Sequence, residues 1–206
     1  MAEGISVDVS NYDQVVKDLR KVPKDLAIGL KRANINLKRQ TGTVVRAEVT
    51  KVYNVKKSTV GGKGNKPDAK PGQTITIAGV SVPFYDVIYT GSRLSPNQFG
   101  MTPRARPSAT PPFVHGHKAA RNYQVRWKPL RAGGRQVLTS DNGLPAFIAT
   151  ANGGATAYVR QGPEPYDIDS IRRLSVPQMI TNEKVGPNIM DEIEKRLEKE
   201  LDRIMK

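Results

Sequence analysis

The chain has 206 residues and a formal net charge of +14, from 33 Lys and Arg against 19 Asp and Glu. This length suits one domain, because independently folding units contain about 100–200 residues. The charge predicts attraction to polyanions or acidic protein surfaces and does not distinguish between them. The absence of cysteine excludes disulfides, thiolate zinc sites and a cysteine nucleophile. No signal-peptide pattern and no apolar run of about 18 residues occurs, so we expect a soluble protein that is not exported.

Two helices are predicted within residues 11–57. A short helical pattern begins at Asn11 and ends before Pro23, which also suits the first turn of the next helix. That second helix is expected to run to about Val52. Its apolar residues recur at steps of three, four and seven, which places on one stripe Leu26, Leu30, Ala33, Leu37, Val44 and Val45. The opposite face is basic, with Lys24, Lys31, Arg32, Lys38, Arg39 and Arg46.

Residues 73–160 are predicted to form a small, mostly antiparallel sheet of about four to six strands, since several turn-bounded segments are rich in β-forming residues. Asp141-Asn-Gly143 and Asn152-Gly-Gly154 are hairpin-type turns, and the second joins two short strands directly, which indicates a meander. Residues 61–72 combine helix breakers with like charges and are predicted to be a loop. The Pro- and Gly-rich residues 91–118 are too many for an ordinary connection, so we expect an arm or binding loop.

Residues 171–206 are predicted to be helical. Ser175 and Gln178 match a capping box, so one helix should begin there. A second helix is expected after Gly186, with the apolar stripe Ile189, Ile193, Leu197, Leu201 and Ile204. The predicted fold is therefore α+β: a long basic N-terminal helix, a small mostly antiparallel sheet with a Pro/Gly-rich arm, and an amphipathic C-terminal helix, in a single domain over residues 1–206.

Side-chain chemistry favours neither an enzyme nor a metal site. His115 and His117 are the only histidines, and residues 90–140 contain no acid that would complete a metal site with them. One acidic cluster, Glu164, Asp167 and Asp169, has the residue types for acid–base catalysis or a hard cation. Prolines interrupt this cluster, and a solvated connection in which Asp169 or Ser170 caps the next helical turn is the simpler interpretation. We predict no catalytic residue, no metal and no cofactor.

Positive charge is the strongest remaining feature. Residues 17–70 hold 15 Lys or Arg against four acids, and residues 90–140 hold nine against none. A solvated basic face would explain this pattern, because charged surfaces keep proteins soluble. The alternative is contact with phosphates or acidic partners, with the candidates Arg104, Arg106, Arg121, Arg126, Arg131 and Arg135. The terminal helix carries six acids against five bases, so copies of the chain could pair through complementary patches.

Three short motifs resemble the minor tail protein Z family of tailed bacteriophages. The first, Leu174-Ser-Val-Pro-Gln-Met179 with Asn182-Glu183 and the charged helix, is similar to the ending of that family. The second, Leu144-Pro-Ala-Phe-Ile-Ala149 with Ala157-Tyr-Val-Arg160, resembles a strand pair of the family, and Val52-Tyr-Asn-Val-Lys-Lys57 resembles the end of its first helix. Relative to the family, residues 91–118 look like an insertion.

The resemblance implies a structural, non-enzymatic virion protein. Such a protein would be a tail-completion or neck component at the head-proximal end of the tail, where it helps to join tail to head. It would be assembled in the host cytoplasm. The implied protein partners are the tail terminator, the head–tail connector and further copies of the chain in a ring, which tail symmetry implies to be a hexamer. Packaged DNA is a further candidate partner, and no membrane contact is expected. The predicted interface comprises Trp127, Leu174, Val176, Pro177, Met179, Ile193, Leu197 and Leu201. The main alternative is a basic DNA-binding module acting on packaged or host DNA, and a weaker one is a nuclease or lytic enzyme using His115, Glu164 and Asp167.

Overall fold

The computed structural model describes residues 23–62, 65, 67–107, 123–151, 154–164 and 167–205. It has a long N-terminal helix, small antiparallel sheets and a C-terminal helix, which confirms the predicted α+β class. The chain divides into two compact units: unit 1 comprises residues 1–49, 57–92 and 176–206, and unit 2 comprises residues 50–56 and 93–175. The single domain stays a prediction. The short helix expected from Asn11 lies outside the described residues.

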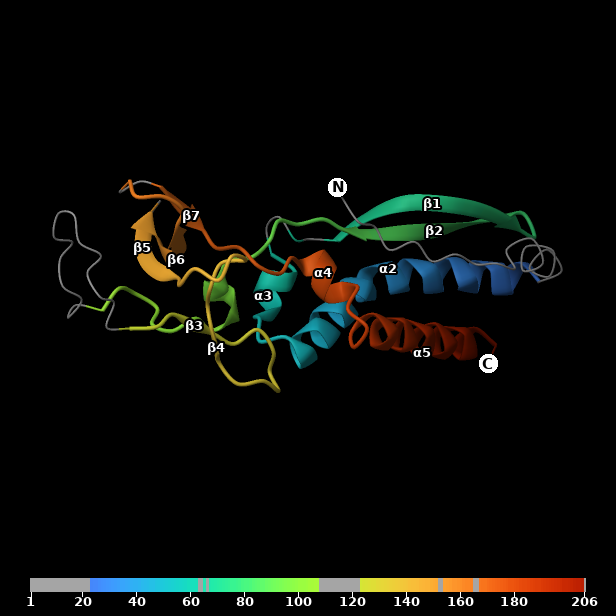
Figure 1. Cartoon of the computed structure of the whole chain (residues 1–206). Helices are drawn as coiled ribbons and strands as arrows, with labels where there is room; N and C mark the ends of the chain where they lie inside the picture. The colour runs from blue at the N-terminus through green and yellow to red at the C-terminus, as the bar shows by residue number, and fades with distance from the viewer. Residues whose placement is uncertain are drawn as a thin grey trace. The chain divides into compact units, whose positions relative to one another are not determined.

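Unit 1 is built on the long helix α2 (Lys24–Val52), whose last three residues belong to unit 2. A hairpin of β1 (Pro67–Ile77) and β2 (Val80–Tyr89) lies along one side of α2, and α5 (Gly186–Met205) lies along the other side (Figure 1). The short helices α3 (Lys57–Val60) and α4 (Val176–Ile180) complete the unit. As the capping box predicts, α4 begins directly after Ser175.

Contacts along α2 define its two sides. Toward the hairpin, Asn34 Nδ2 donates to Pro83 O at 3.2 Å, and Lys38 Nζ lies 4.2 Å from the ring centroid of Tyr85. Toward α5, Arg196 Nη1 donates to Gln40 Oε1 at 2.8 Å. Asn34 and Lys38 are one helical turn apart, whereas Gln40 projects from the opposite side.

The hairpin is longer than the sequence analysis predicts. Pro67 pairs with Tyr89, so β1 begins inside the segment 61–72 that is expected to be a loop. That expectation is wrong for Pro67–Gly72, because proline is compatible with a strand where no partner needs its missing N–H. Ala78 and Gly79 form the connecting turn with φ of 48° and 78°, the left-handed geometry that matches the twist of a two-residue hairpin.

The core of unit 1 joins the first turns of α2 to the hairpin. Ala27 packs with the buried hairpin residues Ile75, Ile77 and Val82, and Leu30 and Val80 border this cluster. Further along the helix, Ala33, Val44 and Val45 of the predicted apolar stripe are buried, whereas Leu26 and Leu37 are half-buried. The stripe is therefore the packing face of α2, as the sequence predicts.

Unit 2 contains three-stranded and two-stranded sheets in place of the single sheet predicted. The strands are β3 (Arg126–Trp127), β4 (Gln136–Val137), β5 (Phe147–Ala151), β6 (Gly154–Arg160) and β7 (Ile168–Ser170). The antiparallel pair β5–β6 is expected from the sequence, and β7 extends it to a meander that the sequence analysis does not predict beyond residue 160. β3 pairs with β4, and its Arg126 also forms an antiparallel bridge with Thr102. Pro129 follows β3 closely and supplies no N–H, which limits this ladder. The shared core is Met101, Val125, Leu138, Ala146, Ile148, Ala157, Val159 and Ile171.

The first part of the expected arm over residues 91–118 is packed into unit 2. Leu94 exchanges backbone hydrogen bonds with Arg173 and Leu174 at 3.0 and 2.9 Å. The 3-10 helix η1 (Pro96–Phe99) follows, with Pro96 and Phe99 buried. The Pro/Gly-rich stretch also contains apolar residues, and burial of their side chains explains this packing. Residues 108–118 lie outside the described part of the chain.

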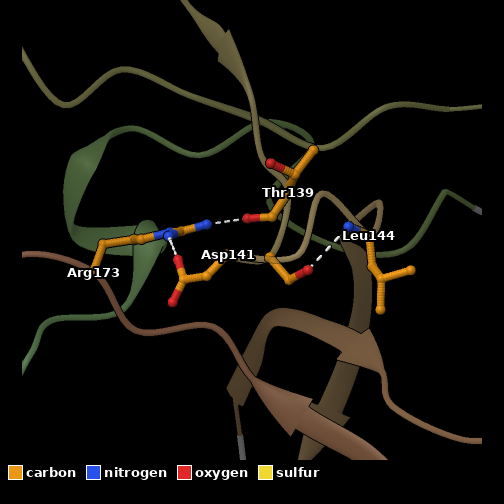
Figure 2. A network of polar contacts seen from close by, with 5 residues as sticks. Thr139, Asp141, Leu144 and Arg173 are labelled. Atoms are coloured by element: carbon orange, nitrogen blue, oxygen red, sulfur yellow. Dashed lines mark hydrogen bonds and ion pairs between the residues drawn. The ribbon is translucent and has the colours of Figure 1, made fainter.

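Arg173 ties the C-terminal end of unit 2 to a tight turn. Its guanidinium donates to Thr139 O and to Asp141 Oδ1 (Figure 2). Within the turn, Ser140 N donates to Leu144 O at 2.8 Å, and Leu144 N donates to Ser140 Oγ at 2.9 Å. The turn predicted at residues 141–143 is thus present, and an arginine distant in sequence holds it.

Candidate functional site

Two charged surfaces stand out, one in each unit. The first, which we call the basic ribbon, comprises Arg126, Lys128, Leu130, Arg131, Arg135 and Val137 of unit 2. The second lies on α5 and consists of two neighbouring rows: the apolar row Met190, Ile193, Leu197 and Leu201, and the acidic row Asp191, Glu194, Glu198 and Asp202.

The two strands of the basic ribbon separate its apolar and charged faces. Arg126 pairs with Val137 and Trp127 pairs with Gln136, so strand alternation places Arg126 and Val137 on one face. Both are exposed. On the other face, Trp127 is half-buried and contacts Phe99 edge to face, with ring centroids 5.5 Å apart. The buried side chains anchor the ribbon, and the exposed ones project into solvent.

Backbone hydrogen bonds hold the ribbon on both of its flanks. Arg126 and Thr102 exchange hydrogen bonds of 2.8 and 2.7 Å. Asn54 N donates to Pro129 O at 2.8 Å, and Arg131 N donates to Val52 O at 2.9 Å. The end of α2 therefore fixes the segment between the two strands, so the positions from which its basic side chains project are determined by the fold.

The arginines that the sequence predicts to contact phosphates or acidic partners are exposed wherever the structure describes them. Arg104, Arg106, Arg126, Arg131 and Arg135 are all exposed, and Arg121 lies outside the described residues. Exposed apolar side chains accompany them, since Leu130 is 40% and Val137 46% exposed. A surface that mixes arginine with exposed aliphatic groups has the composition of a protein contact as well as of a phosphate-binding face.

The rows on α5 follow directly from helical spacing. Members of the apolar row are three or four residues apart, and each member of the acidic row comes one residue later. The two rows therefore run side by side along the helix. All four acids are exposed, whereas all four apolar residues are only half-buried. Beyond the acidic row, on its other side, lies a row of exposed bases formed by Lys195, Lys199 and Arg203.

The remaining predicted interface residues have different environments. Val176 and Met179 are fully buried, so their apolar side chains contribute to the protein core, and their place in the interface stays a prediction. Leu174 and Pro177 are half-buried, and Trp127 packs on the core of unit 2. Ile193, Leu197 and Leu201 remain as surface candidates.

The residues considered for catalysis are not assembled into a site in the described structure. Glu164, Asp167 and Asp169 are exposed near the β6–β7 connection, where Asp167 N donates to Glu164 O at 3.2 Å. Asp169 lies within β7 and does not cap a helical turn, contrary to expectation. His115 and His117 lie outside the described residues. No group of three potential metal-ligating side chains occurs in the described part of the chain, and none of its helices is long and apolar enough to cross a membrane.

Comparisons with protein-family models, curated proteins and solved structures find no match to this chain.

Tyr89, at the end of β2, is a buried polar residue that the sequence analysis missed. Its hydroxyl has no hydrogen-bond partner among the described residues. Burial raises the pKa of Tyr89 to about 12, although the positive charge of Arg46 opposes this shift. Tyr85 has the same residue type in the same strand and is half-buried, so no signal in the sequence distinguishes the two.

Proposed function

We propose that this protein is a structural subunit that associates with copies of itself, and that it acts as a tail-completion or neck component of a tailed-phage virion. The observation that carries the self-association is the half-buried apolar row of α5. The assignment to a phage tail rests on the three sequence motifs that resemble the minor tail protein Z family.

The apolar row has the geometry of an incomplete helix interface. α5 already packs on α2 through Ile204, next to Gly29, and through Arg196. Leu197 and Leu201 of the same helix are half-buried and keep part of their surface in water. Scattered exposed aliphatic residues are ordinary, but a continuous row beside a row of four acids offers a contact that a second subunit would complete.

In the virion, this subunit would form a ring, with hexamers expected from tail symmetry. It would contact the tail terminator and the head–tail connector at the head-proximal end of the tail. No bond-making step is needed for this role, because the work is done by binding between subunits. The protein would be assembled in the host cytoplasm and end in the virion neck.

Replacement of the apolar row tests this proposal. The double variant Leu197→Asp/Leu201→Asp should fail to self-associate, because each carboxylate would be charged in the contact. Light scattering after size-exclusion chromatography measures the subunit number. Met205→Asp is the matched control, since Met205 is on the same helix and 69% exposed. Assembly of the double variant at wild-type strength would refute the proposal, as would absence of labelled wild-type protein from the neck of virions.

A second candidate function, binding to packaged or host DNA, is favoured by the basic ribbon. In that case, the affinity for duplex DNA should fall steeply with salt, by roughly one logarithmic unit per tenfold salt increase for each neutralised phosphate. The double variant Arg126→Ala/Arg131→Ala should then lower the salt slope by about two. If wild-type protein does not bind duplex DNA at low salt, this candidate is eliminated.

A further inference from the structure

We infer that the basic ribbon of one copy docks on the acidic and apolar rows of α5 in a second copy. This inference rests on the proposed self-association and specifies which surfaces meet. It joins two different regions of the chain, so the contact would be head to tail. Contacts of this type close into a ring when the rotation between subunits permits it.

Charge complementarity selects this partner. The acidic row presents four exposed carboxylates along one line of the helix. The basic ribbon belongs to residues 90–140, which hold nine Lys or Arg and no acid. Two basic ribbons would repel each other, and so would two acidic rows. A basic ribbon and an acidic row attract each other.

The apolar side chains match in the same arrangement. On α5, Leu197 and Leu201 adjoin the acidic row. On the ribbon, Leu130 and Val137 are exposed next to basic residues. Docking would bury aliphatic groups of both copies at the same time as it pairs their charges, which is the common arrangement of an apolar centre with a charged rim.

The acidic row lies on a regular helix, and the ribbon consists of two short strands with the connection between them. From Asp191 to Asp202, the acidic row spans twelve residues of one helix, and its ends are about 16 Å apart at a rise of 1.5 Å per residue. Backbone hydrogen bonds with Thr102, Val52 and Asn54 fix the ribbon. Little backbone ordering would therefore be needed on binding, which favours association.

Paired charge reversals test the docking. The ribbon variant is Arg126→Glu/Arg131→Glu, and the row variant is Glu194→Lys/Glu198→Lys. Each variant alone should self-associate at least about tenfold more weakly than wild type, because like charges would face each other. An equimolar mixture of the two variants should recover association, since the ribbon and row are then complementary in every contact between unlike variants. Sedimentation equilibrium measures all three samples.

Two matched controls address folding and general charge. Arg172→Glu in unit 2 and Glu183→Lys in unit 1 change exposed residues outside both surfaces, and each should associate like wild type. Circular dichroism and the unfolding midpoint should match wild type for every variant used.

Three results would overturn the inference. If either variant associates as strongly as wild type, the surface that it alters is not in the contact. The proposed self-association through the apolar row of α5 would then still stand. Mixing without recovery would show that the two surfaces do not meet each other. A wild-type protein that remains monomeric would overturn this docking, and its absence from virions would separately refute the proposed function.

Discussion

Gly29 of α2 lies directly against Ile204 of α5: a Cβ added at Gly29 would be 2.8 Å from Ile204 Cγ1 and closer still to Cγ2. A glycine within a helix costs about 1 kcal/mol relative to alanine. Here it allows the final turn of α5 to approach the backbone of α2. Together with the hydrogen bond between Arg196 and Gln40, this contact sets the two helices antiparallel.

Gly29→Ala should therefore lower the free energy of unfolding by about 1–2 kcal/mol, because Ile204 must move away from the added methyl group. The measurement is urea unfolding followed by circular dichroism. The double variant Gly29→Ala/Ile204→Ala removes the clash and should be more stable than Gly29→Ala alone. A single variant more stable than wild type would show that helix propensity outweighs this contact.

Gly100 ends η1 in the left-handed conformation, with φ of 67°. Gly100→Ala should cost about 1–2 kcal/mol of stability, because an L-residue is strained there. In addition, the new Cβ would lie 2.9 Å from Asn54 Nδ2. Gly134→Ala is the matched control, since no atom lies within 4 Å of its added Cβ. Equal thermal midpoints for the two variants would contradict this prediction.

Loss of the Arg173 guanidinium should destabilise the turn that it holds. For Arg173→Met, we expect a decrease of about 1–3 kcal/mol in unfolding free energy, because hydrogen bonds to Thr139 O and Asp141 are lost. Hydrogen exchange at the Ser140 and Leu144 amides should become faster. Arg172→Met, at the exposed neighbouring position, should change stability by less than about 0.5 kcal/mol. Unchanged exchange in Arg173→Met would show that the turn is stable without the arginine.

The buried hydroxyl of Tyr89 should make stability depend on alkaline pH. Its pKa is about 12 in the folded protein and about 10 in the unfolded chain. Between these values, the unfolded chain loses the Tyr89 proton while the folded protein keeps it, so this contribution to stability is intact below pH 10 and declines as pH rises toward 12. The slope is at most about 1.4 kcal/mol per pH unit for one proton.

Tyr89→Phe should reduce this alkaline loss and leave the other titrations in place. At pH 7 the variant should be at least as stable as wild type, because it removes a buried hydroxyl without a described hydrogen-bond partner. Urea unfolding at pH 7, 10 and 11 compares the two proteins. Identical pH dependence of wild type and Tyr89→Phe would refute the role assigned to this residue.

Local sequence patterns determined the long helices α2 and α5, the β5–β6 pair and the charged rows of α5. Each depends on spacing within one segment, and the 3.6-residue period of a helix is enough to place Leu197 beside Glu198 on neighbouring rows. The α+β class follows from the order of these segments.

Only the tertiary structure decided which residues these elements bury and which strands pair. Pro67–Gly72 has a loop-like composition, yet it is a strand because β2 supplies its partner. Val176 and Met179 have the apolar character of Leu197 and Leu201, but the first two are buried and the others remain partly exposed. Burial and strand pairing depend on residues distant in the chain, so no local pattern specifies them.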